Sequence, residues 1–157
     1  MMAAIGCAID YSNASMIRTK LQAAADAAVL ATVSVNSPVV ATSKGMTGNG
    51  TVSGGSTYAA NFFSANLPAG YTSVSPTATV TLTGTTVTAV VSYSTTVSTY
   101  FMGIVGYPSI TIGSSSTAAY TLPTYIDFYL MLDVSGSMSF PSTTAEQARL
   151  QAVNPDN

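Results

Sequence analysis

Apolar positions recur every three or four residues near the start of the chain, a spacing that places side chains on one face of an α-helix. The nine residues before Asp10 are all apolar or small, and no Gly or Pro occurs between Gly6 and Pro38. The pattern predicts one helix over residues 4–33. The apolar stripe consists of Ala14, Ile17, Leu21, Ala24, Ala28 and Ala31.

The next segment changes first in composition and then in period. Residues 34–57 are rich in Ser, Thr and Gly, which predicts a loop or an irregular hairpin. Residues 58–66 are typical of a short helix that ends before Pro68. Between residues 78 and 93, apolar positions alternate with Thr on either side of Gly84. This period of two predicts a β-hairpin.

After the hairpin, residues 97–107 form a second apolar segment that predicts a short helix closed by a proline. Residues 109–112 and 117–121 favour two further strands. Residues 126–133 are a continuous apolar run that ends in an aspartate, which is typical of a strand buried on both faces of a parallel sheet. A loop follows, and a helix is predicted to begin near residue 142.

These patterns divide the chain into three parts. Residues 1–33 form a membrane or packing helix, residues 34–125 a β-rich domain outside the cytoplasm, and residues 126–157 the start of an α/β domain. The predicted fold class is therefore α+β, with a long N-terminal helix packed on a small antiparallel sheet and an incomplete α/β domain after it.

Composition narrows the classes of function. Only 6% of the residues are charged, while Ser and Thr contribute 21 and 23 residues, a balance that suits polar-faced β structure in an exported protein. The net charge of −2 and the absence of a Lys/Arg cluster argue against nucleic-acid binding. The sequence contains no His and a single cysteine, Cys7, which excludes His-dependent catalysis and an internal disulfide.

The apolar start is too short to cross a bilayer, which takes about 20 residues. Because the helical period continues beyond it, we interpret it as the end of a membrane span whose beginning is missing. Arg18 and Lys20 follow this segment but are offset by Asp10 and Asp26. Charge therefore does not fix the orientation of the chain in a membrane.

One motif carries candidate chemistry. Asp133, Ser135 and Ser137 offer three oxygen atoms at alternate positions after the apolar run. Hard divalent cations prefer oxygen ligands, and ligands bind at the carboxyl ends of strands in α/β folds. The alternative is a loop in which Asp133 or Ser137 caps the following helix. A haloacid-dehalogenase loop would need an acid at position 135, and a serine-hydrolase elbow would need a base and flanking glycines.

With its preceding apolar strand, this motif resembles the start of a von Willebrand factor A domain, whose metal-ion-dependent adhesion site opens with Asp-x-Ser-x-Ser. The resemblance implies that Asp133, Ser135 and Ser137 are metal ligands, with Mg²⁺ or Mn²⁺ bound in the complete domain. That family takes further ligands from later loops. We therefore do not expect these 157 residues alone to bind the metal tightly.

The N-terminal segments Ala8–Ser12 and Arg18–Ala31 resemble the opening helix of TadE/TadG-like Flp (tight adherence) pilus-assembly proteins. Residues 99–106 and 116–118 resemble the stretch that precedes the A domain in such proteins. The resemblance implies a pilin-like, non-enzymatic minor subunit in the bacterial inner membrane, with most of the chain periplasmic or extracellular. Its expected partners are other pilus-assembly proteins or pilins, with an unknown adhesion ligand.

The small residues of the helix suggest a mode of assembly. Ile17, Leu21, Ala24 and Ala28 form a stripe that lets another helix approach closely. The alternative is that this stripe covers the protein's own sheet. Two other functions remain open: a metal-dependent adhesion receptor acting through its A domain, and a generic secreted β-rich surface protein.

Overall fold

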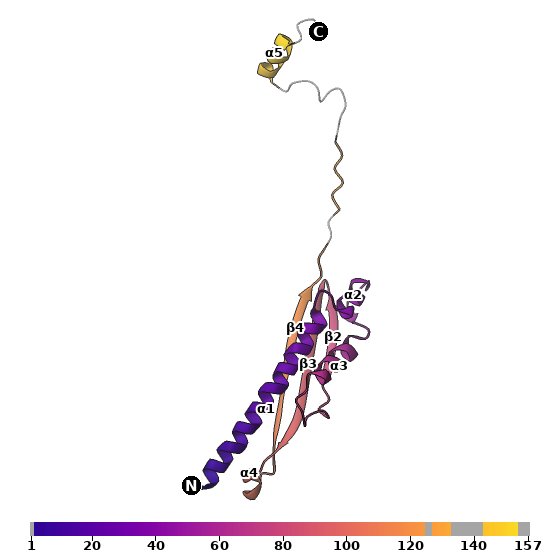
Figure 1. Ribbon diagram of the computed structural model, residues 1–157. Coiled ribbons are helices and arrows are strands. Elements are labelled where there is room, and N and C mark those ends of the chain that lie inside the picture. Colours follow the sequence, from indigo (N-terminus) through magenta and orange to yellow (C-terminus); the bar gives the residue numbers. More distant parts are fainter. Residues whose placement is uncertain (1, 125–126, 133–142, 154–157) are drawn as a thin grey trace. The chain divides into compact units, whose positions relative to one another are not determined.

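The computed structural model describes residues 2–124, 127–132 and 143–153. The chain divides into two compact units, residues 1–124 and residues 125–157. The first unit is a long helix packed on an antiparallel sheet (Figure 1). Its elements are α1 (Met2–Val33), α2 (Pro38–Lys44), β1 (Gly50–Thr51), α3 (Gly55–Ala65), β2 (Thr77–Thr83), β3 (Thr86–Ser98), α4 (Phe101–Ile104) and β4 (Ser109–Thr121).

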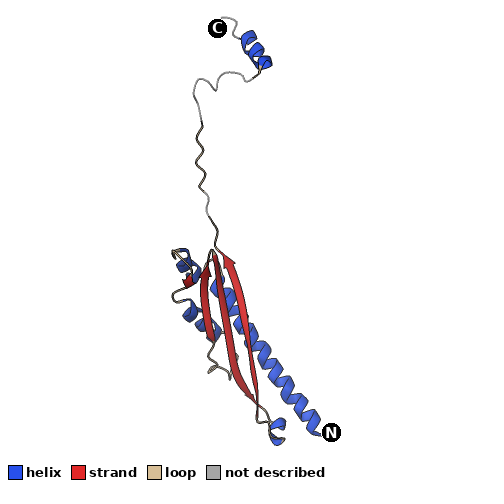
Figure 2. Ribbon diagram, turned by 180° about the vertical axis from the view of Figure 1, so that it is seen from behind, coloured by secondary structure: helices blue, strands red, loops and turns tan. Residues whose placement is uncertain are grey.

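Helix α1 confirms the predicted N-terminal helix and runs along one face of the sheet, as Figure 2 shows from the other side. Alanine is the strongest helix former, and the alanines of α1 also let the helix lie close to the strands. Five of the six predicted stripe residues are buried in the core, and the sixth, Ala31, is half-buried. The helical period therefore identified the face that packs on the sheet.

The four strands follow one another in the sheet in chain order, and every neighbouring pair is antiparallel. The predicted hairpin is formed by β2 and β3, which meet at the pair Thr83 and Thr86. Gly84 has a φ of 59°, a left-handed conformation that glycine adopts without strain in such a turn. Strand β4 pairs with β3 along thirteen residues and forms one edge of the sheet.

Strand β4 corrects the prediction of two separate strands. Residues 113–116, Gly-Ser-Ser-Ser, have low strand preference, but each of them pairs with a residue of β3. Gly113 also suits this position sterically, because a Cβ there would lie 2.9 Å from the carbonyl oxygen of Tyr93. Cross-strand pairing therefore outweighs local preference over this stretch.

Helix α2 lies in a segment where the composition predicted only a loop or a hairpin. It begins in a regular way, with Ser37 as the N-cap and Pro38 in the first turn. The Ser37 hydroxyl accepts a hydrogen bond from the Val40 N–H (3.0 Å) and donates one to the Thr32 carbonyl (2.6 Å). The Ser-Pro pair was the local signal for this helix, although the surrounding Ser, Thr and Gly obscured it.

Helix α3 begins three residues earlier than predicted, at Gly55, and lies close to the sheet. A Cβ at Gly55 would fall 2.8 Å from the Cβ of Val80, so glycine is what permits this approach. Further along α3, the Phe63 side chain is fully buried and stacks on Tyr93 with ring centroids 5.8 Å apart. This aromatic pair joins α3 to the central strand.

The helix predicted over residues 97–107 is much shorter in the structure. Strand β3 continues to Ser98, because Val97 is buried in the core and pairs with Ile110 of β4. Only Phe101–Ile104, the segment α4, is helical. The apolar residues of this region therefore belong to the end of a strand, one turn of helix and an exposed loop.

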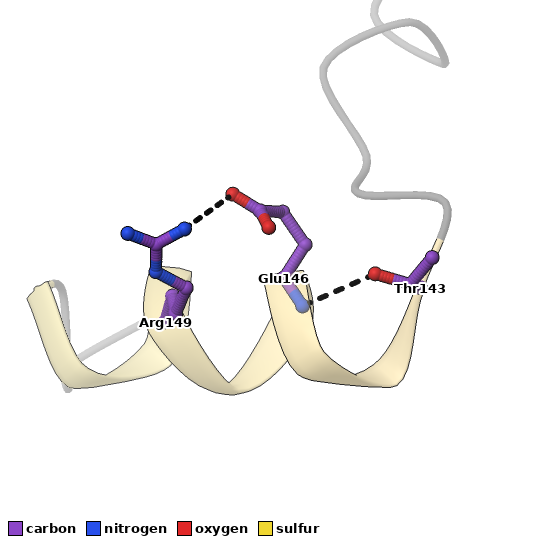
Figure 3. A network of polar contacts seen from close by, with 3 residues as sticks. All are labelled: Thr143, Glu146 and Arg149. Atoms are coloured by element: carbon purple, nitrogen blue, oxygen red, sulfur yellow. Dashed lines mark hydrogen bonds and ion pairs between the residues drawn. The ribbon is translucent and has the colours of Figure 1, made fainter.

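The second unit contains one described helix, α5 (Thr144–Val153). The Thr143 hydroxyl accepts a hydrogen bond from the Glu146 N–H (3.3 Å), and Arg149 forms an exposed ion pair with Glu146 (3.6 Å), as Figure 3 shows. Residues 127–132 have no regular structure, and residues 128–132 are exposed. No strand is formed at residues 127–132 of the buried strand predicted over residues 126–133, and residues 126 and 133 lie outside the described residues.

Candidate functional site

Asp10 joins the N-terminal part of α1 to the segment that contains α4. One carboxylate oxygen accepts hydrogen bonds from the N–H groups of Phe101 (2.8 Å) and Met102 (2.7 Å), and the other from the N–H of Tyr100 (3.2 Å). These N–H groups belong to the first turn of α4, where a helix has no internal acceptor to offer them. The carboxylate therefore caps α4 from a residue 90 positions earlier in the chain.

The contact beside Asp10 is very close. A Cβ at Gly6 would lie 2.5 Å from the Cβ of Phe101, so only glycine lets α4 come this near to α1. Gly6 and Asp10 are four residues apart and therefore share one face of α1. The sequence showed Asp10 as an interruption of an apolar run. Its partner could not be identified because nothing local links residue 10 to residues 100–102.

The hydrogen bonds change the acidity of Asp10. The N–H of Met102, together with those of Tyr100 and Phe101, lowers the pKa of Asp10 below its ordinary value of 3.8, although burial opposes this shift. A lowered pKa in the folded state means that folding favours the carboxylate. Its contribution to stability is complete above the unfolded-state pKa and is lost as the pH falls through the lowered folded-state pKa.

We expect Asp10→Asn to remove this pH dependence. The amide keeps one acceptor oxygen but has no charge, so α4 should be held less firmly at neutral pH. The difference in thermal midpoint between wild type and Asp10→Asn should be largest above about pH 5 and should shrink as the pH falls below the ordinary pKa. Circular dichroism melts over a pH series measure it. A difference that stays constant at every pH would contradict the assignment.

The outer face of the same part of α1 is apolar and open. Ile5, Ile9 and Met16 are all more than half exposed, and Ala8, Ser12 and Asn13 lie beside them. Together these six residues line a shallow hollow of about 470 Å³.

Among the described residues, no single helix is long and apolar enough to cross a membrane. Ile5–Val33 with Pro38–Lys44, bent by 40°, passes that test only as a pair.

A second polar cluster holds the middle of α1 to β4. The Gln22 side-chain amide donates to the Ser116 hydroxyl (2.8 Å) and to the Asp26 carboxylate (3.1 Å), while Ser116 donates to the same carboxylate (2.5 Å). Tyr93 adds a further link, because its hydroxyl donates to the Arg18 carbonyl (3.2 Å). These contacts tie the helix to the sheet.

Ile17, Leu21, Ala24 and Ala28, the residues predicted for helix packing, are all buried between α1 and the sheet. Another protein's helix would therefore contact other faces of α1.

The predicted metal ligands Asp133, Ser135 and Ser137 lie outside the residues that the structure describes. Within the described ranges, no three His, Cys, Asp or Glu residues come together as a metal site would require.

Comparison with known proteins gives one finding, and it falls on the helix described above. No curated protein and no solved structure matches the chain. A family model does match over residues 1–35, a range that covers α1 with its apolar outer face and Asp10. Over residues 1–35, the chain is thus similar to the pilus-assembly family described as "Tad: Putative Flp pilus-assembly TadE/G-like".

Proposed function

We propose that the protein is a non-enzymatic, envelope-anchored minor pilin-like subunit that takes part in assembly of a Flp/Tad adhesion pilus. The observation that carries the proposal is the match of residues 1–35 to the TadE/G-like pilus-assembly family. Nearly all of the matched segment belongs to α1, whose two faces have different surroundings. One face packs on the chain's own sheet, and the other leaves Ile5, Ile9 and Met16 exposed.

The exposed apolar face suggests where the helix acts. Exposed side chains such as Ile5 and Ile9 are typical of helices that contact a membrane or another protein. We therefore place the start of α1 at the bacterial inner membrane and the sheet on its periplasmic or extracellular side. The expected partners are other pilus-assembly proteins or pilins, which would meet the exposed faces of α1.

A deletion strain tests the proposal. Removal of the complete gene should abolish surface Flp pili, counted by electron microscopy, and restoration of the wild-type gene should return them. The deletion strain is also complemented with two variant genes. Met16→Asp changes the exposed face of α1, and the control Ser34→Asp changes an exposed residue just beyond the end of α1. We expect only Met16→Asp to reduce the pilus count. Normal pili in the deletion strain would overturn the proposal.

The Asp133–Ser137 motif supports a second candidate, a metal-dependent adhesion receptor with Mg²⁺ or Mn²⁺ at Asp133, Ser135 and Ser137. In the same strain, Asp133→Ala separates the two roles. An assembly subunit should keep its pili and its adhesion after this change. Loss of adhesion with an unchanged pilus count, and the same loss on removal of divalent cations, would favour the receptor. If every variant left both pili and adhesion intact, a generic surface protein would remain.

A further inference from the structure

One end of the first unit exposes large apolar side chains from two elements that lie together. α4 lies beside the N-terminal end of α1 in both views (Figures 1 and 2). Ile104 is 86% exposed and Tyr100 is 79% exposed, although both belong to a segment with a well-defined contact to α1. We call this surface the apolar end. It consists of Ile5, Ile9, Tyr100, Phe101, Ile104, Val105 and Tyr107.

The apolar end carries no free charge. Residues 5–17 and 99–108 contain a single ionisable acid or base, Asp10, apart from Cys7 and tyrosines. Asp10 is only 4% exposed, and three backbone N–H groups occupy its carboxylate. The one charge that would resist removal from water is therefore already covered by protein groups.

The backbone of the exposed segment is also largely satisfied from within. The N–H groups of Val105 and Tyr107 both donate to the Met102 carbonyl, at 3.0 and 2.9 Å. The Thr99 N–H donates to the Pro108 carbonyl (3.0 Å), and the Thr99 hydroxyl donates to the Tyr107 carbonyl (2.5 Å). A segment enters an apolar phase at low cost only when its polar backbone groups have such partners.

The side chains and nearby charges favour a lipid surface over a protein partner. Tyrosines combine an apolar ring with a polar hydroxyl and are enriched at membrane–water interfaces, and Tyr100 and Tyr107 flank Ile104 in the sequence. The first charges beyond the apolar end are both cations, Arg18 and Lys20, and both are exposed on α1. They begin about 12 Å along the helix axis from Asp10, within reach of anionic headgroups.

We propose that the apolar end is seated in the headgroup layer of an anionic bilayer, with α4 as a second membrane contact beside α1. Asp10 is the positioning residue that holds α4 in place, and Arg18 and Lys20 face the anionic surface. The proposal rests on the envelope role given above but adds a contact through α4, which lies outside the matched segment 1–35. It also explains why Asp10 anchors a four-residue helix whose neighbours Tyr100, Val105 and Tyr107 are all exposed.

Vesicle co-sedimentation tests this contact with the purified full chain. The vesicles contain phosphatidylcholine alone or phosphatidylcholine mixed with phosphatidylglycerol, and we expect stronger binding to the anionic mixture. The double change Ile104→Ser with Val105→Ser should weaken binding about tenfold or more, because it removes two exposed aliphatic side chains from the contact. The matched control is Val35→Ser, which is 54% exposed but lies beyond the far end of α1, and it should bind as wild type does.

Three results would overturn the proposal. Wild-type binding by the double variant would leave α4 outside the contact, and equal loss in the Val35→Ser control would mean that binding is unspecific. The third result is that the double variant binds vesicles as wild type does but sediments as a smaller species than the wild type. In that case the apolar end is a contact between two copies of the chain. Unchanged circular dichroism of both variants verifies folding. The vesicle assay contains no pili, so a lack of vesicle binding would overturn the membrane contact but not the proposed role in pilus assembly. A change in pilus count without a change in vesicle binding would also count against the membrane contact.

Discussion

Replacing Phe63 with alanine is expected to lower the free energy of unfolding by about 3–5 kcal/mol, the usual range for a fully buried phenylalanine. The Phe63 side chain has no exposed surface, and it stacks on Tyr93 of the central strand. The change would leave a cavity between α3 and β3 and would remove this ring contact. Urea unfolding followed by tyrosine fluorescence and circular dichroism gives the free energy.

The neighbouring residue provides the control. Phe62 lies on the same helix but is only half-buried, at the margin of the core. Phe62→Ala should cost less, about 1 kcal/mol. Equal losses for the two variants would mean that α3 does not pack on the sheet through Phe63.

Replacing Leu21 with alanine is the second change with a large expected effect. Leu21 is the largest fully buried side chain of α1 and lies in the core between the helix and the sheet. We expect the free energy of unfolding to fall by about 2–5 kcal/mol, because the alanine stripe around this residue has few atoms that can fill the cavity. The same urea titration measures it.

Leu30→Ala is the matched control, since it makes the same substitution in the same helix at a side chain that is 62% exposed. Alanine favours the helix at both positions, so helix preference cancels in the comparison. The control should remain within about 0.5 kcal/mol of wild type. A large loss at Leu30 with none at Leu21 would assign the opposite face of α1 to the core.

The parts of the fold that the sequence predicted are those governed by local periodicity. The stripe through Leu21 and the alternation around Gly84 each reflect one buried face, and a buried face repeats with the geometry of its own element. Strand β4 was divided in two because residues 113–116 have weak strand preference. Their pairing with β3 depends on residues 19 to 25 positions earlier in the chain. Local preference contains no information about that partner.

The candidate site was harder to predict for the same reason. Asp10 is conspicuous within an apolar run, yet its role depends on three backbone N–H groups at residues 100–102. The apolar residues of segment 97–107 predicted a helix, whereas most of them prove to be exposed around α4. The motif Asp133, Ser135 and Ser137 stays a prediction, because those residues lie outside the described part of the chain.

The packing of α1 on β4 also determines the order in which the chain can fold. The buried stripe of α1 is synthesised well before β4, the strand that covers part of it, which ends only at Thr121. Closing contacts over such long separations is slow, and apolar surface stays exposed in the meantime. During synthesis, α1 therefore presents both its outer face and its future core face. An export factor or membrane that receives the nascent helix would bind a surface that the folded protein no longer displays.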